Sequence, residues 1–514
     1  MSRRISCLVL VLGTVFVLAP LVASAAGDDS LGPIRKKLES SDTWDRITAV
    51  RDLIRLSPPA EKARPLIEQF VADTHPDVRI ETVWAIHEIL GASGTDLLAK
   101  LYADRDRRVR DSAIQVACRM WDKRDPRDLC IAAFDDPDFS ARVEVISTLK
   151  DHFAKDPRAI ELFRRALGDP SEMVQRAGVF AVQAARDSRS VDALAAIARN
   201  SSDLAAVPAV DEALATIGGP QAVRVLISLL ARPRAEDGKA GARTRPSDLV
   251  RAAAARALAR LKDPSAAPAL REVLPDPSVP VKLGAMEALM QLRDRKAVPL
   301  ISRELTSDEP RVRRFALRAL RMIGDPSAAK DVRRVLREEK DENVRATAAL
   351  TLADMLGEKA IPDLLALKDD LSPAVRLEAA GALAGFGRPA AEALAAFLSD
   401  PDQGVQMMAI EGLGQMRDAS QIPALAALAA DRSPQAVQIR IKVAEALGRI
   451  AAPAALAPLL DLASDPEPAV REEVARALAT FDDPDAKAAL ARLMKDSIAS
   501  VRNAARRASG ARSK

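Results

Sequence analysis

The sequence predicts an all-α solenoid, in which short helices pair as hairpins and the hairpins stack side by side. Three observations predict it. One residue pattern recurs along the chain at spacings of 30–34 residues, with one exception of 44. Aromatic residues make up only 3% of the 514 residues, whereas a globular core normally uses more large rings. Asp-Pro and Ser-Pro pairs, which end one helix and begin the next, punctuate the chain.

Each repeat contains a short first helix and a longer second helix. The second helix carries Val-Arg, two variable residues, a small residue, two variable residues and Ala-Leu, as at Val375-Arg376 with Ala379, Ala382 and Leu383. These apolar positions have helical spacing, so one face of each second helix is predicted to be buried. A single repeat cannot bury that face alone, so about 15 repeats with a period of about 31 residues must stack.

Residues 1–26 are typical of a secretory signal peptide. Two arginines precede an apolar run over 5–19, and a small-x-small pattern follows at 23–25. We expect cleavage near Ala25-Ala26 and a secreted or periplasmic protein. An uncleaved N-terminal anchor is the alternative.

The rest of the chain is predicted to comprise three segments. Residues 27–231 are divergent, aromatic-rich repeats, and residues 248–514 are regular, Ala-rich repeats that end in a basic cap. Residues 232–247 contain Gly, Pro and charged residues and are predicted to be a mobile loop within one repeat, or alternatively a docking loop.

Charge and motif content exclude several functions. The net charge is +4, which is close to neutral for this length and does not suit a general nucleic-acid binder. The sequence contains no phosphate-binding glycine loop and no nucleophile elbow. We therefore expect no catalytic residue, no metal site and no cofactor.

The repeat resembles the HEAT repeat, in the short bacterial form known as the phycobilisome-lyase-type HEAT-like repeat, over about residues 33–510. The resemblance implies a right-handed, armadillo-like superhelix whose second helices line a concave face. It also implies a structural ladder built from an Asp six residues before the Arg of each repeat. The ladder residues include Asp73 with Arg79, Asp104 with Arg110, Asp370 with Arg376, and Asp465 with Arg471.

Some proteins with such repeats are enzymes. Deoxyhypusine hydroxylase resembles this architecture and holds two irons with several His-Glu pairs, but this sequence has one such pair, His87-Glu88. Bilin lyases share only the repeat itself with this chain. Neither activity is expected to carry over.

Two cysteines remain after the predicted cleavage. Cys118 ends a second helix and Cys130 lies in the next first helix, so an antiparallel hairpin could bring them together. An oxidising compartment would allow a disulfide. Two independent buried thiols are the alternative.

Two groups of residues are candidate binding sites for a protein partner. The position six residues after each repeat start is expected to face outward and is mostly polar, so Trp84 and Phe180 stand out there as aromatic anchors. A local shift of register that buries both is the alternative. Arg314, Arg318 and Arg321 belong to a basic cluster that could bind an acidic partner or an anionic glycan, or could be a solvated, salt-bridged helix face.

The predicted function is a protein–protein interaction scaffold that binds its partner along the concave face. The first alternative is an enzyme or enzyme-accessory protein of the HEAT-like lyase or hydroxylase type. The second is the binding of nucleic acid or another anionic polymer by the basic patch. No membrane span is expected after signal cleavage.

Overall fold

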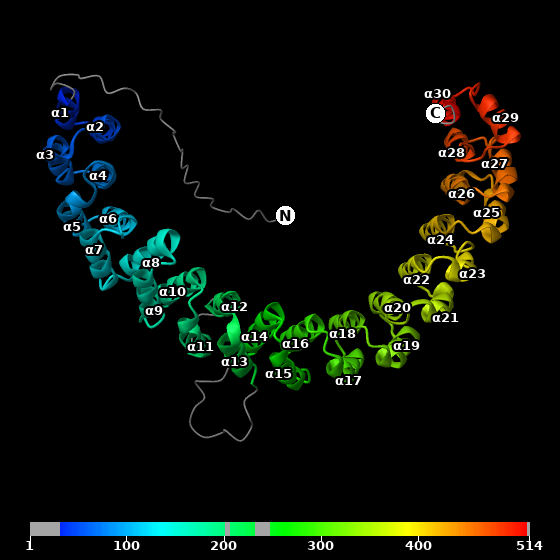
Figure 1. Cartoon of the computed structure of the whole chain (residues 1–514), viewed down its shortest axis with the longest axis horizontal. Helices are drawn as coiled ribbons and strands as arrows, with labels where there is room; N and C mark the ends of the chain where they lie inside the picture. Colours follow the sequence, from blue (N-terminus) through cyan, green and yellow to red (C-terminus); the bar gives the residue numbers. More distant parts are fainter. Residues whose placement is uncertain (1–30, 201–205, 232–246, 511–514) are drawn as a thin grey trace. The chain divides into compact units, whose positions relative to one another are not determined.

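The computed structural model describes residues 31–200, 206–231 and 247–510 (Figure 1). Every regular element in these ranges is helical, which confirms the predicted all-α solenoid. The expected signal peptide and residues 232–246 lie outside them. No helix within these ranges has the length and apolar character needed to cross a membrane.

The chain divides into two compact units, Met1–Ala185 and Arg186–Lys514. Each is described by itself below. The segment 232–247, which the sequence predicts to lie within one repeat, falls inside the second unit. There it joins two helices that pack against each other as one repeat, α13 (Gly219–Leu230) and α14 (Asp248–Leu261).

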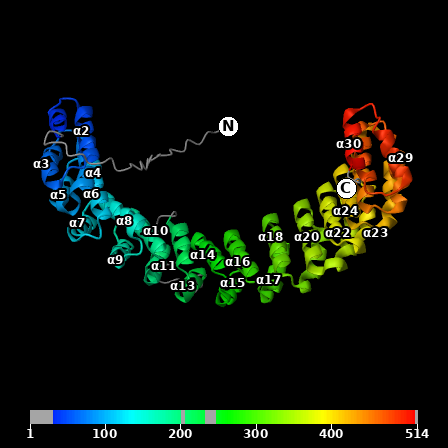
Figure 2. The same ribbon diagram turned by 45° about the horizontal axis from the view of Figure 1, so that its top comes forward.

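Unit 1 contains five helix pairs in the described residues. The second helices α2, α4, α6, α8 and α10 pack side by side as one layer, and the first helices form the other (Figures 1 and 2). The helices are α1 (Gly32–Leu38), α2 (Thr43–Leu56), α3 (Ala60–Val71), α4 (Pro76–Ala85), α5 (Thr95–Tyr102), α6 (Arg107–Arg119), α7 (Arg124–Phe134), α8 (Phe139–Phe153), α9 (Pro157–Ala166) and α10 (Glu172–Ala185).

Unit 2 contains ten further pairs in the part of the chain that the structure describes. Its even-numbered helices form one layer, on the inner side of the curve that this unit makes in Figure 1. The remaining helices are α11 (Val191–Asn200), α12 (Ala206–Ile217), α15 (Ala267–Glu272), α16 (Val279–Gln291), α17 (Val298–Arg303), α18 (Pro310–Ile323), α19 (Ala329–Glu338), α20 (Glu342–Leu356), α21 (Ile361–Leu365), α22 (Pro373–Gly385), α23 (Ala391–Ala395), α24 (Gln403–Met416), α25 (Ile422–Ala429), α26 (Val437–Ile450), α27 (Leu456–Leu462), α28 (Pro468–Leu478), α29 (Pro484–Leu493) and α30 (Ala499–Gly510).

Aspartates begin many of the second helices. The side chain of Asp138 accepts a hydrogen bond from the Ser140 amide (2.9 Å) at the start of α8, and that of Asp402 accepts one from the Gly404 amide (2.8 Å) at the start of α24. Such caps satisfy amides that have no partner within the helix. They explain why the Asp-rich joints of the sequence mark helix boundaries.

Arginines of the second helices join consecutive repeats. Nη1 of Arg79 donates to the backbone oxygen of Asp73 (2.7 Å), while its Nε and Nη2 donate to the carboxylate of Asp104 in the next repeat (2.6 and 2.8 Å). The carboxylate therefore pairs with the arginine of the preceding repeat, and not with the arginine six residues after it. The same two-sided geometry recurs at Arg345, Arg376 and Arg471, whose carboxylate partners are Asp370, Asp400 and Asp496.

The arginine ladder is irregular at Arg110. Its Nη1 donates to the backbone oxygen of Asp104 (2.9 Å), but its contact with a carboxylate is one of 3.8 Å to Asp138. The carboxylate of Asp136, at the position that pairs in other repeats, accepts the hydroxyl hydrogen of Tyr102 instead. Asp465, another predicted ladder residue, accepts from Arg440 (2.8 Å) and Arg432 (2.6 Å).

Cys118 in α6 and Cys130 in α7 form a disulfide, with their Cα atoms 5.6 Å apart. Both cysteines are fully buried beside Trp121, the largest fully buried side chain in the described residues. The bond links the last turn of one second helix to the following first helix.

Candidate binding surface

In each unit, the exposed side chains of the even-numbered helices form what we call its second-helix face. At the position six residues after each repeat start, no side chain in the described structure is buried. These residues are Arg51, Trp84, Gln115, Ser147 and Phe180 in unit 1, and Glu212, Arg256, Glu287, Arg318, Leu350, Gly381, Glu411, Glu445, Arg476 and Arg507 in unit 2.

Trp84 lies half-buried on α4. The guanidinium carbon of Arg119, on the neighbouring helix α6, is 4.7 Å from the centroid of its ring, and His87 approaches it edge-on with a centroid distance of 6.4 Å. A guanidinium over an indole face is an attractive arrangement. The ring is therefore held in place while part of it stays accessible.

Phe180 lies on α10 and is 45% exposed, and Met173, seven residues earlier on the same helix, is 51% exposed. Ala177 and Ala184 occupy the same face at helical spacing. These four residues form an apolar strip on the second-helix face of unit 1. Sequence reasoning identified Phe180 but missed Met173, although the spacing of seven residues was a sufficient signal.

Between Trp84 and Phe180, the second-helix face of unit 1 carries partly buried carboxylates. Burial raises the pKa of Glu144 on α8, against hydrogen bonds from Gln115 and Thr148. Burial also raises the pKa of Asp111 on α6, against the attraction of Arg107. The middle of this face is therefore polar, with aromatic side chains on either side of it.

In unit 2, the structure places the three predicted arginines on α18. Arg314 and Arg318 are exposed, and neither forms an ion pair with any residue that the structure describes. Arg321 is half-buried and forms an ion pair with Asp354 of α20. In this cluster, Arg321 is therefore paired with a carboxylate, whereas Arg314 and Arg318 have no carboxylate partner among the described residues.

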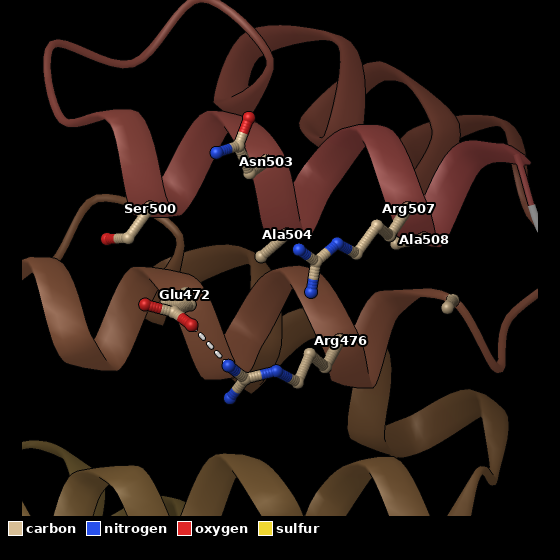
Figure 3. A pocket seen from close by; sticks show the side chains of 8 residues that line it. Glu472, Arg476, Ser500, Asn503, Ala504, Arg507 and Ala508 are labelled. Atoms are coloured by element: carbon tan, nitrogen blue, oxygen red, sulfur yellow. Dashed lines mark hydrogen bonds and ion pairs between the residues drawn. The ribbon is translucent and has the colours of Figure 1, made fainter.

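A pocket of about 480 Å³ hollows the second-helix face between α28 and α30 (Figure 3). Arg476 of α28 and Arg507 of α30 line this pocket, together with Ser500, Asn503, Ala504 and Ala508 of α30. Arg476 is already paired with Glu472 and with Glu473 (2.5 Å). Sequence reasoning did not foresee this pocket, because it arises from small side chains on two separate helices.

The histidines occupy separate environments. His75 caps α4 by accepting the Asp77 amide hydrogen at Nδ1 (3.3 Å), and His87 contacts Glu88 (3.0 Å). Within the described residues, no group of three or more His, Cys, Asp or Glu side chains could hold a metal ion.

The sequence matches the family model for HEAT repeats over residues 32–118, 126–207, 239–308, 299–371, 361–440 and 434–510. No curated protein sequence matches the chain significantly. Kap121p is similar in structure, with a TM-score of 0.55 at 13% identity, over 93% of this chain and 64% of that chain.

Kap121p bound to Pho4p gives a TM-score of 0.52 at 15% identity, over 88% of this chain and 56% of that chain. This chain thus spans 56% and 64% of these two Kap121p chains, and at these identities the likeness concerns the fold alone. Human deoxyhypusine hydroxylase in complex with glycerol is 28% identical over 51% of this chain and 96% of that chain, with a TM-score of only 0.23. Because the repeat model matches most of its length, the chain belongs to the family of HEAT-repeat proteins.

Proposed function

We propose that this protein is a scaffold that binds a partner protein along its second-helix face. The observation that carries the proposal is the accessible apolar strip of Met173 and Phe180 beside the polar middle of the second-helix face of unit 1. Clustered, accessible apolar side chains with a polar surround are typical of protein-binding surfaces. The structurally similar Kap121p also supports a role in protein binding, because it is seen bound to Pho4p, to RanGTP and to Ste12p.

The proposal concerns a binding protein without catalytic activity. The repeat recognises shape through many small contacts, with Trp84 and Phe180 as anchors, and needs no cofactor. Metal analysis of the purified protein would contradict this if it found one bound equivalent of iron or zinc. A protein of the HEAT-like lyase or hydroxylase type would then be the better description.

We place the protein outside the cytoplasm, in the periplasm or secreted, as a short HEAT-like repeat protein of the bacterial phycobilisome-lyase type. The signal-like residues 1–26 support this location, and the Cys118–Cys130 disulfide suits an oxidising compartment. N-terminal sequencing of the protein from fractionated cells tests it. A mature protein that begins near Ala26 is expected, and a cytosolic protein with an intact N-terminus would refute the location.

Site-specific photo-crosslinking in the native cells tests the scaffold. A photoreactive amino acid replaces Gln115 or Ser147, which lie on the second-helix face between the two anchors. In control proteins it replaces Lys100 of α5 or Glu161 of α9, which are exposed on first helices. A discrete protein adduct is expected from the former pair only, and the Trp84→Ala/Phe180→Ala double variant should lose it. Equal adducts from all four positions, or none from Gln115 and Ser147, would refute the proposed surface.

A further inference from the structure

The exposed face of α18 carries a row of arginines. Arg311, Arg314 and Arg318 are spaced three and four residues apart, so they lie on one side of the helix. All three are exposed, and none forms an ion pair with a residue in the described ranges. The row therefore presents three uncompensated positive charges over two turns.

Several other basic residues on the second-helix face of unit 2 have carboxylate partners in the chain. The pairs are Arg260 with Glu212, Arg321 with Asp354, Lys442 with Glu445 (3.0 Å), Arg449 with Glu445 (2.6 Å) and Arg476 with Glu472. Arg256 and Arg507 also form no ion pair with a described residue, but neither forms part of a row. The α18 row is thus a run of three arginines on this face for which the described residues provide no carboxylate partner.

Apolar side chains flank the arginine row. Met322, one turn beyond Arg318 on α18, is 46% exposed, and Phe315 is half-buried on the same helix. Leu350 of α20 is half-buried at the position equivalent to Arg318 in the next repeat. The ion pair between Arg321 and Asp354 ties the two helices together beside these residues. The surface combines fixed apolar contacts with free guanidinium groups.

We propose that the α18 arginine row, with Met322 and Leu350, binds a segment of a partner protein in which acidic and apolar side chains alternate. The inference rests on the proposed scaffold function and specifies the chemistry of the partner. Guanidinium groups bind carboxylates through paired hydrogen bonds, and complementary charge directs the encounter. The apolar neighbours select a peptide over a sugar or nucleic-acid polymer, because such polymers offer the arginines charge but leave Met322 and Leu350 exposed to water.

Fluorescence anisotropy tests this with the full chain and a labelled synthetic peptide of alternating Glu and Leu residues. The key variant is Arg314→Glu/Arg318→Glu. The matched control is Arg303→Glu/Arg337→Glu, which makes the same change of charge at exposed arginines of the first helices α17 and α19 that form no ion pair with a described residue. At roughly 0.15 M salt, the first should weaken binding by at least about tenfold and the second by less than about twofold.

Three outcomes would overturn the inference. One is tight binding of the same peptide with every Glu replaced by Gln. Another is an equal loss of affinity in both double variants, which would indicate attraction by net charge alone. The third is equally tight binding of a sulfated oligosaccharide at the same residues. If any of these occurs while the crosslinks from Gln115 and Ser147 persist, the scaffold function stands and only this partner assignment fails.

Discussion

Arg471 shows how one side chain joins two repeats. Its Nη1 donates to the backbone oxygens of Asp465 (2.7 Å) and Pro466 (3.1 Å), and its Nε and Nη2 donate to the carboxylate of Asp496 (2.7 and 2.9 Å). The rigid, planar guanidinium group suits this two-sided role. Lysine at the equivalent position 282 makes a single hydrogen bond to Glu304 (2.7 Å).

Replacing Arg471 with Ala should lower the free energy of unfolding by about 1–3 kcal/mol, because it leaves partly buried acceptors without a donor. Arg476→Ala is the control, since Arg476 is more exposed and pairs within its own helix. That control should cost less than about 0.5 kcal/mol. Denaturant unfolding measures both, and equal values would refute the structural role of the arginine ladder.

Asp211 is the converse case, an ionisable residue in a position that elsewhere is apolar. It lies in α12 and is 3% exposed, and neither carboxylate oxygen has a hydrogen-bond partner in the described residues. In the even-numbered helices from α2 to α10 and from α14 to α28, the residue at the equivalent position is apolar and buried. Burial raises the pKa of Asp211 to about 7, against the attraction of Arg256 and Arg260 and with a small contribution from Glu212.

This raised pKa makes stability depend on pH. The unfolded chain releases the Asp211 proton near pH 4 and the folded chain near pH 7, so stability falls as pH rises through that window. Asp211→Asn should raise the free energy of unfolding by roughly 3–4 kcal/mol at about pH 8 and by only about 1–2 kcal/mol at about pH 5, where most of the window has not yet been crossed. Thermal unfolding at the two values tests this. A variant effect that is equal at both would show that Asp211 does not titrate in this range.

At the scale of helices, glycines set how closely neighbouring second helices approach. A Cβ atom added to Gly448 of α26 would lie 2.7 Å from Cβ and 2.9 Å from Cα of Ala477 in α28. At Gly381 of α22, the nearest atom would be the sulfur of Met408 at 4.0 Å, an ordinary contact. The same substitution should therefore have opposite effects at these two sites.

Gly448→Ala should destabilise the protein by about 1–3 kcal/mol, because the helices must separate to admit the methyl group. Gly381→Ala should stabilise it by about 0.5–1 kcal/mol, because alanine favours the helix and meets no obstacle. Thermal unfolding distinguishes them. Stabilisation by both substitutions would mean that α26 and α28 are not in close contact.

The disulfide between α6 and α7 stabilises a single hairpin. Its cysteines are separated by 12 residues, and closing a loop of this size typically contributes about 2–3 kcal/mol. A Cys118→Ala/Cys130→Ala variant should unfold at a lower temperature than the oxidised protein. Alkylation without reductant followed by mass analysis provides the direct check, and two labelled thiols in the native protein would exclude the bond.

Helix pairs could be predicted from the sequence because each carries its own signals. The Val-Arg pattern located the second helices, and Asp138 and Asp402 mark helix starts through a local hydrogen bond. The repeat pattern predicts which Asp and Arg residues build the ladder, but it does not give the carboxylate partner of each arginine. Arg79 follows Asp73 by six residues, but its carboxylate partner, Asp104, lies in the next repeat. Which carboxylate the arginine reaches therefore depends on how the repeats stack.

At the scale of the molecule, stacking also determines which parts of the surface are hollowed or charged. The outward register of Trp84 and Phe180 followed from the repeat alone. The pocket between α28 and α30 and the unpaired state of Arg314 did not, because each depends on side chains of two or more repeats. Sequence patterns within a repeat therefore predict which face is available, whereas contacts between repeats decide what it can bind.

The arginine ladder recurs in many repeats, so the stability that the molecule loses at low pH is the sum of the contributions of its individual ladder carboxylates. Hydrogen bonds from Arg471 lower the pKa of Asp496, against a smaller opposing effect of burial. In Asp104, Asp370 and Asp400 burial acts to raise the pKa, but the hydrogen bonds from arginine and from a backbone amide together prevail and lower it. Carboxylates of this kind contribute stability above their unfolded pKa and lose it as the pH falls through the folded value.

The melting temperature should therefore fall steeply below about pH 4, where these carboxylates become protonated together. Asp496→Asn isolates one step of this process. It should be less stable than the parent by about 1–2 kcal/mol near pH 6, and the difference should shrink as the pH falls through the lowered pKa of Asp496, because the carboxylate of the parent then becomes protonated as well. A difference that persists unchanged to the lowest pH would mean that the charge of Asp496 does not contribute to stability, and acid unfolding would then need another origin.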